Sequence, residues 1–193
     1  MMVRVGSLLA AGAFVIATVC AATAAPAPKV FELTSSSFRD GGHLAVKNAG
    51  NIQGMPNCVG ENISPPLAWT DPPDGTKSFA LLMFDPEANG GIGNSHMVIY
   101  GIPASVTGFA EGEISKPSDK YVGGKNGRGL STYQGPCTPP NTDWHHYTLI
   151  LVATDLDPKA LEPGLTREDL LAKLKGHAKG TAGLIGKFRH PEK

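Results

Sequence analysis

Short hydrophobic stretches bounded by turn-forming residues recur along most of the chain. They are rich in β-branched, aromatic and aliphatic residues, a composition typical of β-strands. The predicted strands cover residues 30–33, 43–46, 78–84, 96–102 and 147–153. The run Ser-Phe-Ala-Leu-Leu-Met-Phe at 78–84 is apolar at successive positions, which predicts a central strand covered on both faces. Residues 51–75 and 101–140 are predicted to be mostly loop, because turn residues interrupt them repeatedly.

One stretch near the C-terminus has the hydrophobic spacing of a helix. Thr166 is placed to act as the N-cap, with Asp169 completing a capping box. Apolar residues then recur at helical spacing: Leu170, Leu171, Leu174 and Ala178. Gly180 is the predicted stop. The pattern as a whole predicts a mainly β domain with one or two peripheral helices.

The first 24 residues have the features of a secretory signal peptide. Arg4 supplies a positive charge, residues 8–19 are apolar, and the segment ends in Ala-Thr-Ala. We expect cleavage after Ala24, leaving one domain over residues 25–193 in a periplasmic or secreted protein. The apolar run is short for a bilayer span of about 20 residues, so no integral membrane anchor is expected after cleavage. Cys20 leaves a lipoprotein as the alternative, although Val19 is an atypical residue before a lipidated cysteine.

The charge balance narrows the class of partner. Without Arg4 the chain carries 16 basic and 17 acidic residues, so it has neither the excess of basic residues typical of nucleic-acid-binding proteins nor a stripe of basic residues that would bind an anionic membrane.

The two remaining cysteines, Cys58 and Cys137, predict a disulfide in an oxidising compartment. The alternative is a pair of buried free thiols.

The candidate chemistry begins at a Gly/Pro-rich loop that runs into two histidines and an apolar strand, residues 130–147. Side chains alternate between the faces of a strand, so His145 and Tyr147 share a face and His146 points to the other. His145 is therefore the site candidate.

The same alternation predicts that His96, Val98 and Tyr100 share a face. Asp85 ends the central strand just before Pro86, where a carboxylate either begins a turn or lies at the rim of the sheet. Two histidines and one acid at strand ends outline a small polar pocket.

Three chemistries could use that set. A metal such as non-haem iron is disfavoured because no tight ligand spacing occurs. A hydrolytic triad using Ser95 or Ser131 is disfavoured because neither serine lies in a G-x-S-x-G elbow. Anion binding by imidazoles, a tyrosine hydroxyl and loop amides is favoured, with no metal and no cofactor. The glycine-rich residues 123–129 are interpreted as a surface loop rather than a phosphate loop.

These segments, in this order, resemble the phosphatidylethanolamine-binding protein family in its bacterial Raf kinase inhibitor-like branch. The motifs that carry the resemblance are Asn62-Ile-Ser-Pro-Pro-Leu-Ala-Trp69, Gly75-Thr-Lys-Ser-Phe-Ala80, Asp85-Pro-Glu-Ala88, Ser95-His96 through Ile102-Pro103, Tyr133-Gln-Gly-Pro-Cys-Thr-Pro-Pro140 and His145-His-Tyr147. They cover about residues 30–190, nearly all of the expected mature chain.

The resemblance implies a large antiparallel sheet packed on a smaller one, with peripheral helices and a small anion pocket. By motif, the residues implied to line that pocket are Asp85, His96, Gly135, Pro136, His145 and Tyr147. Three positions depart from the family pattern. Glu87 replaces an aspartate, His146 replaces an arginine, and Met97 stands where tryptophan is usual, so a less aromatic pocket wall is expected.

The resulting hypothesis is a non-enzymatic binding protein for a small anionic or phosphorylated ligand. His96 and His145 would donate hydrogen bonds to the anion, Tyr147 and the loop near Gly135 would orient it, and Asp85 would fix a histidine tautomer. A protein partner, as for an inhibitor of a protease or a kinase-like protein, is the second hypothesis. A weak hydrolase or metal enzyme is the third.

Overall fold

A computed structural model describes residue 2 and residues 28–191. The predicted signal peptide, residues 1–24, lies outside the described residues apart from Met2, and its cleavage stays a prediction. Among the described residues, no helix is long and apolar enough to cross a membrane.

Two β-sheets of unequal size form the framework. The larger has six strands in the order β2-β9-β8-β4-β5-β7, and the smaller has three in the order β1-β3-β6. All pairings are antiparallel except that of β2 with β9. The strands are β1 (Glu32–Thr34), β2 (Gly42–His43), β3 (Leu67–Thr70), β4 (Ser78–Asp85), β5 (Asn94–Pro103), β6 (Gly108–Phe109), β7 (Val122–Gly123), β8 (His145–Thr154) and β9 (Ala178–Phe188). The helical elements are α1 (Ala88–Gly91), α2 (Arg167–Leu174) and the 3-10 turns Val46–Asn48 and Glu113–Ser115.

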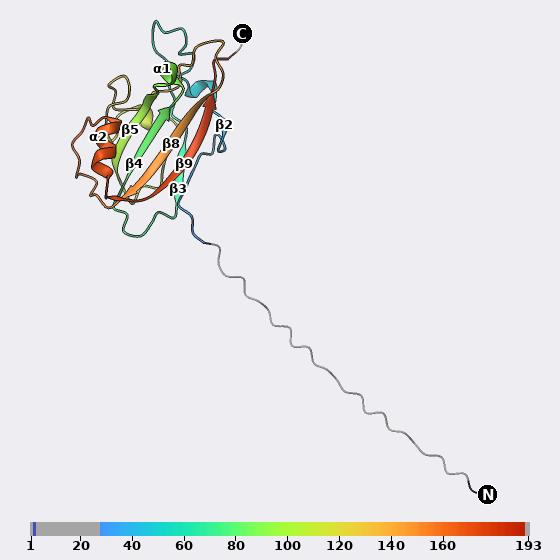
Figure 1. Ribbon diagram of the computed structural model, residues 1–193, viewed down its shortest axis with the longest axis vertical. Coiled ribbons are helices and arrows are strands. Elements are labelled where there is room, and N and C mark those ends of the chain that lie inside the picture. The colour runs from blue at the N-terminus through green and yellow to red at the C-terminus, as the bar shows by residue number, and fades with distance from the viewer. Residues whose placement is uncertain (1, 3–27, 192–193) are drawn as a thin grey trace.

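The central position of β4 explains its unbroken apolar sequence. Phe79, Leu81 and Met83 point into the core between the two sheets, whereas Ala80 and Leu82 point into a second core beneath α2. The large sheet is therefore covered on both faces, as predicted. Figure 1 shows α2 beside β5 and β4, and α1 at one end of the same strands.

Two of the strand predictions need correction. Of residues 43–46 only His43 is in a strand, because the side chain of Asn48 accepts a hydrogen bond from the Ala45 amide at 3.0 Å and closes a 3-10 turn. The segments predicted as loop contain three short strands, β3, β6 and β7.

The helix prediction is right at its start and wrong at its end. Thr166 caps α2 by accepting a hydrogen bond from the Asp169 amide. The helix ends at Leu174, and Gly176, with a left-handed φ of +85°, forms part of the turn that follows. Ala178 and Gly180 belong to β9, which pairs with β8 along its length.

Cys58 and Cys137 form the predicted disulfide. The bond joins the loop that precedes β3 to the loop that precedes β8, two segments 79 residues apart in sequence. It therefore fixes the position of the Gly/Pro-rich loop that leads into the two histidines.

Candidate functional site

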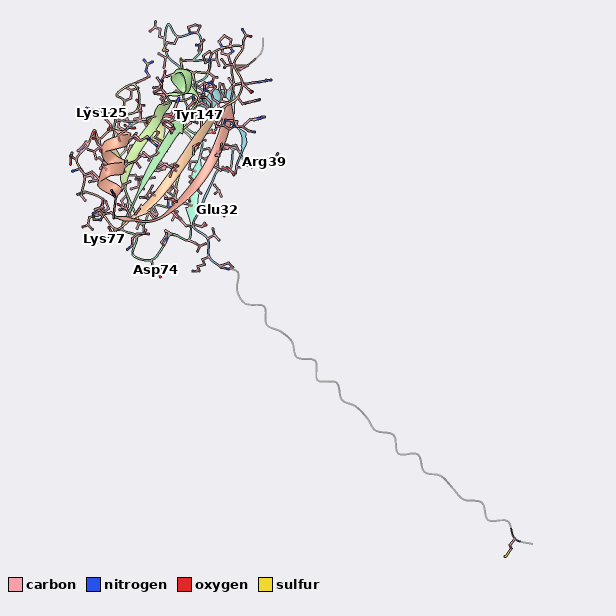
Figure 2. The ribbon with its side chains drawn as sticks, viewed as in Figure 1. Glu32, Arg39, Asp74, Lys77, Lys125 and Tyr147 are labelled. Carbon is pink, nitrogen blue, oxygen red and sulfur yellow. A yellow bond between two sulfur atoms is a disulfide. The ribbon has the colours of Figure 1, made fainter. Side chains whose placement is uncertain are left out.

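An open cavity of about 530 Å³ lies where β4, β5 and β8 approach α1. Figure 2 shows Tyr147 at the α1 end of the large sheet, whereas Asp74 and Lys77 lie at the opposite end. The residues lining the cavity are Met55, Asp85, Glu87, Ala88, Asn89, Gly90, Asn94, His96, Gly127, Arg128, Gln134, Cys137, Thr138, Pro139, Thr142, His145 and Tyr147. Four of the six predicted site residues, Asp85, His96, His145 and Tyr147, are therefore brought together.

Asp85 organises the inner end of the cavity. It is the last residue of β4 and is only 2% exposed. One carboxylate oxygen, Oδ1, accepts hydrogen bonds from the amides of Glu87 and Ala88 at 3.0 and 3.1 Å. The other, Oδ2, lies 2.8 Å from Nδ1 of His145. Asp85 thus holds the turn after β4 and lines the cavity at the same time.

The two adjacent histidines separate as strand alternation predicts. The carboxylate of Asp85 is an acceptor, so Nδ1 of His145 carries the proton and Nε2 remains available to a ligand. His146 is exposed and does not line the cavity. It instead clamps Glu87, whose Oε2 accepts from the His146 amide at 3.0 Å and whose Oε1 lies 2.9 Å from the ring Nδ1. This hydrogen bonding lowers the pKa of Glu87 against a desolvation effect that would raise it.

His96 reaches the cavity through a β-bulge. Met83 pairs with Met97 and Phe84 with Ser95, so His96 is an extra residue on β5. The prediction that it shares a face with Val98 and Tyr100 is therefore wrong. Those two pack in the core beneath α2, whereas the His96 ring contacts Tyr147, a residue of the core between the sheets.

The hydrogen bonds of His96 define its tautomer. Nδ1 lies 2.9 Å from the carbonyl oxygen of Gln134 and must donate to it. Nε2 then accepts from the side-chain amide of Asn94 at 3.2 Å and lies 3.9 Å from Oδ2 of Asp85. Burial lowers the pKa of His96 below its ordinary value, although the Gln134 carbonyl and the charge of Asp85 act in the opposite direction. His96 is therefore neutral near pH 7 in the structure as described.

Tyr147 provides a buried hydroxyl at the base of the cavity. Its oxygen lies 3.1 Å from Oγ1 of Thr138, and its ring meets that of His96 edge-on with centroids 5.0 Å apart. Burial, together with the negative charge of Asp85, raises the pKa of Tyr147. The phenol thus stays protonated, and its single proton is shared among Asp85, Thr138 and any ligand that enters the cavity.

Gly135 and Pro136 were implied to line the pocket, but they do not. They anchor the loop behind it: the Gly135 amide donates to Oδ1 of Asn62 at 2.8 Å, and the Pro136 carbonyl accepts from the Gly50 amide at 2.7 Å. A Cβ on Gly135 would lie 2.1 Å from the backbone oxygen of Asn48, so only glycine fits. Both residues shape the cavity indirectly.

Sequence reasoning missed the contribution of the glycine-rich loop. Gly127 and Arg128 line the cavity, and the Arg128 guanidinium contacts the sulfur of Met55 at 3.1 Å. No sequence pattern links these positions to the histidines, because the pairing of β5 with β7 brings the loop to the cavity. The expectation for Met97 was wrong as well: its side chain is fully buried in the core between the sheets and forms no wall of the cavity.

The alternative nucleophiles lie outside the cavity. Neither Ser95 nor Ser131 is among the described residues that line it. Ser95 borders an adjacent surface hollow formed with Lys125 and Arg167. The triad considered from sequence is therefore not assembled around Asp85.

Comparison with known proteins gives a consistent result. The model of a family described as phosphatidylethanolamine-binding protein matches residues 34–189. A UPF0098 protein of Methanothermobacter thermautotrophicus is 40% identical over 147 residues, covering 75% of this chain and 95% of the relative. A Mycobacterium tuberculosis protein named as a lipoprotein, LppC, is 34% identical over 173 residues, covering 89% and 78%. The crystal structure of Escherichia coli YbcL, described as a member of the mammalian PEBP family, superimposes with a TM-score of 0.74 at 28% identity, covering 82% of this chain and 98% of YbcL.

Proposed function

Because the chain belongs to the phosphatidylethanolamine-binding protein family, we propose that it is a non-enzymatic protein that binds a phosphoryl or similar small anionic group in the cavity. The observation that carries the proposal is the convergence of His96, His145 and Tyr147 around one buried carboxylate, Asp85. The tyrosine hydroxyl is a hydrogen-bond donor as it stands, and each histidine gains a second N–H donor when its ring is protonated.

The histidines require a proton before they can hold the anion. In both rings Nδ1 is already engaged, with Asp85 in His145 and with the Gln134 carbonyl in His96. Nε2 of either ring donates to an anion only when the ring is protonated, and in His96 the anion must also displace the Asn94 amide from which Nε2 accepts. Anion binding is therefore accompanied by proton uptake, and affinity increases as the pH falls.

Arg128 supplies the one fixed positive charge among the described residues that line the cavity. It comes from a loop at the rim, whereas Tyr147 is 1% exposed at the base. An anion bound between them has a permanently charged donor on one side and a neutral phenol donor on the other.

We place this function outside the cytoplasm. The Cys58–Cys137 disulfide persists in oxidising compartments, and the relative LppC is named as a lipoprotein. The predicted signal peptide at residues 1–24 agrees with this location. Fractionation of expressing cells and N-terminal sequencing test it, and a mature protein that begins at Ala25 is the expected result.

Calorimetric titration tests the anion site. Sulfate is a suitable probe because its charge is constant between about pH 5 and 8, so any pH dependence comes from the protein; O-phosphorylethanolamine is the second probe. We expect affinity to rise by up to about tenfold per pH unit of decrease for each proton taken up, with a binding enthalpy that depends on the ionisation enthalpy of the buffer.

Two histidines offer a matched pair of variants. His145→Gln removes the cavity imidazole and should abolish most binding, whereas His177→Gln changes an exposed ring that pairs with Asp155 outside the cavity and should retain it. Equal affinity in His145→Gln and wild type, or no binding of either probe at pH 5.5, would refute the proposed function.

A further inference from the structure

Three side chains in the cavity form a cluster whose composition is that of a metal site. One ligand atom each from Asp85, Glu87 and His145 lies within 4.8 Å of the other two. Ligand atoms about 2.1 Å from a tetrahedral Zn²⁺ lie about 3.4 Å apart. Glu87, whose side chain is 39% exposed, can close that difference by a small rotation at the expense of a hydrogen bond to His146. We propose that these three residues bind a divalent transition-metal ion of the Zn²⁺ type. Because Nδ1 of His145 carries the proton shared with Asp85, binding of the ion through Nδ1 releases that proton to solvent.

The carboxylates are already oriented by a surrounding layer of hydrogen bonds. The amides of Glu87 and Ala88 hold Oδ1 of Asp85, and both oxygens of Glu87 are held by His146. Both lone pairs of Asp85 Oδ1 are used, but Oδ2 of Asp85 and each oxygen of Glu87 retain a second lone pair for an ion. Outer hydrogen bonds of this kind fix metal ligands in position and increase affinity. They also give His146 a role, because it positions Glu87 without lining the cavity.

The fixed charges of the cavity favour a cation at this end. Among the described residues that line it, the acidic side chains are Asp85 and Glu87, and the one Lys or Arg side chain is Arg128. The two carboxylates converge on His145, whereas Arg128 contacts Met55 at the rim. Two negative charges so close together repel each other unless a cation lies between them.

The ligand types select the class of ion. Mg²⁺ and Ca²⁺ prefer oxygen ligands throughout, whereas a mixed imidazole and carboxylate set suits Zn²⁺ and its neighbours in the first transition series. Three protein ligands leave a coordination position open to water or to an anion. The cation site does not rest on the proposed function, although an anion bound there would share the cavity with the ion.

Zinc titration of untagged protein, stripped with EDTA and dialysed into a phosphate-free buffer at pH 7, tests the proposal. We expect saturable binding of one Zn²⁺ per chain, with weaker binding of Mn²⁺ and none of Mg²⁺ at the same concentration. Glu87→Gln and His145→Gln should each weaken Zn²⁺ binding by at least about tenfold. Glu111→Gln is the control, because this exposed carboxylate pairs with Lys47 outside the cavity. Thermal melts of all variants in EDTA verify that each is folded.

Two results would overturn the proposal: no saturable Zn²⁺ binding by wild type, or equal affinity in wild type and Glu87→Gln with both proteins folded. A sulfate titration of the EDTA-treated protein separates this inference from the proposed function. Sulfate binding without Zn²⁺ binding refutes the metal site alone, and Zn²⁺ binding without sulfate binding refutes the anion site alone.

Discussion

Removing the disulfide should destabilise the protein by several kilocalories per mole. The Cys58→Ala/Cys137→Ala double variant opens a covalent loop whose ends are 79 residues apart in sequence. The chain-entropy model gives about 4.5 kcal/mol for a loop of that length at 25 °C. Because the unfolded chain keeps residual structure, the realised loss should fall between about 2 and 4.5 kcal/mol. This is a large share of the roughly 5–15 kcal/mol by which domains are stable.

Equilibrium unfolding in urea, followed by fluorescence and circular dichroism, measures the loss. The variant should unfold at lower urea with a larger m-value, because a chain without the cross-link exposes more surface when denatured. Wild type in reductant should match the variant, and reductant should not change the variant. A difference below about 1 kcal/mol between oxidised wild type and the variant would refute the entropic argument.

Three further changes test other parts of the structure. Gly135→Ala places a Cβ 2.1 Å from the backbone oxygen of Asn48, so the free energy of unfolding measured in urea should fall by at least about 2 kcal/mol. Gly183→Ala is the control: its Cβ would have its nearest contact at 3.8 Å, and the free energy of unfolding should change by less than about 1 kcal/mol. Burial lowers the pKa of His96, so as the pH falls the unfolded chain takes up a proton on this ring before the folded chain does. In EDTA, the melting temperature should therefore fall as the pH drops below about 6.5, and His96→Gln should make that fall less steep. An unchanged slope in His96→Gln would show that His96 is not the group responsible. Thr166→Ala removes the N-cap of α2 and should cost about 1 kcal/mol in the same unfolding assay; no loss would mean that the cap does not stabilise the helix.

Local patterns identified the parts of the fold that depend on local chemistry. The apolar run of β4 correctly predicted a strand buried on both faces, and the capping residues Thr166 and Asp169 correctly predicted the start of α2. Strand alternation separated His145 from His146 correctly, because β8 is regular from its first residue. These successes share one cause: the deciding interactions lie within a few residues of each other in the chain.

β9 shows where local patterns fail. The strand contains Gly180, Gly183 and Gly186, so its sequence has little β propensity and was partly read as the end of a helix. In the structure a Cβ on Gly186 would meet the side chain of Leu44 at 2.8 Å. A larger residue would displace the side chain of Leu44, which belongs to a segment more than a hundred residues away in sequence.

The amino-acid sequence by itself determined the fold class, the cap of α2 and the choice of His145 over His146, and it favoured a Cys58–Cys137 disulfide over two free thiols. Only the tertiary structure decided how the site is assembled. A bulge turned His96 towards Tyr147, a distant loop brought Arg128 to the rim, and His146 was joined to Glu87. Each of these depends on register and on contacts between segments far apart in the chain. Such contacts produce no periodic pattern in a single sequence, because the residues that make them are close only in the folded chain.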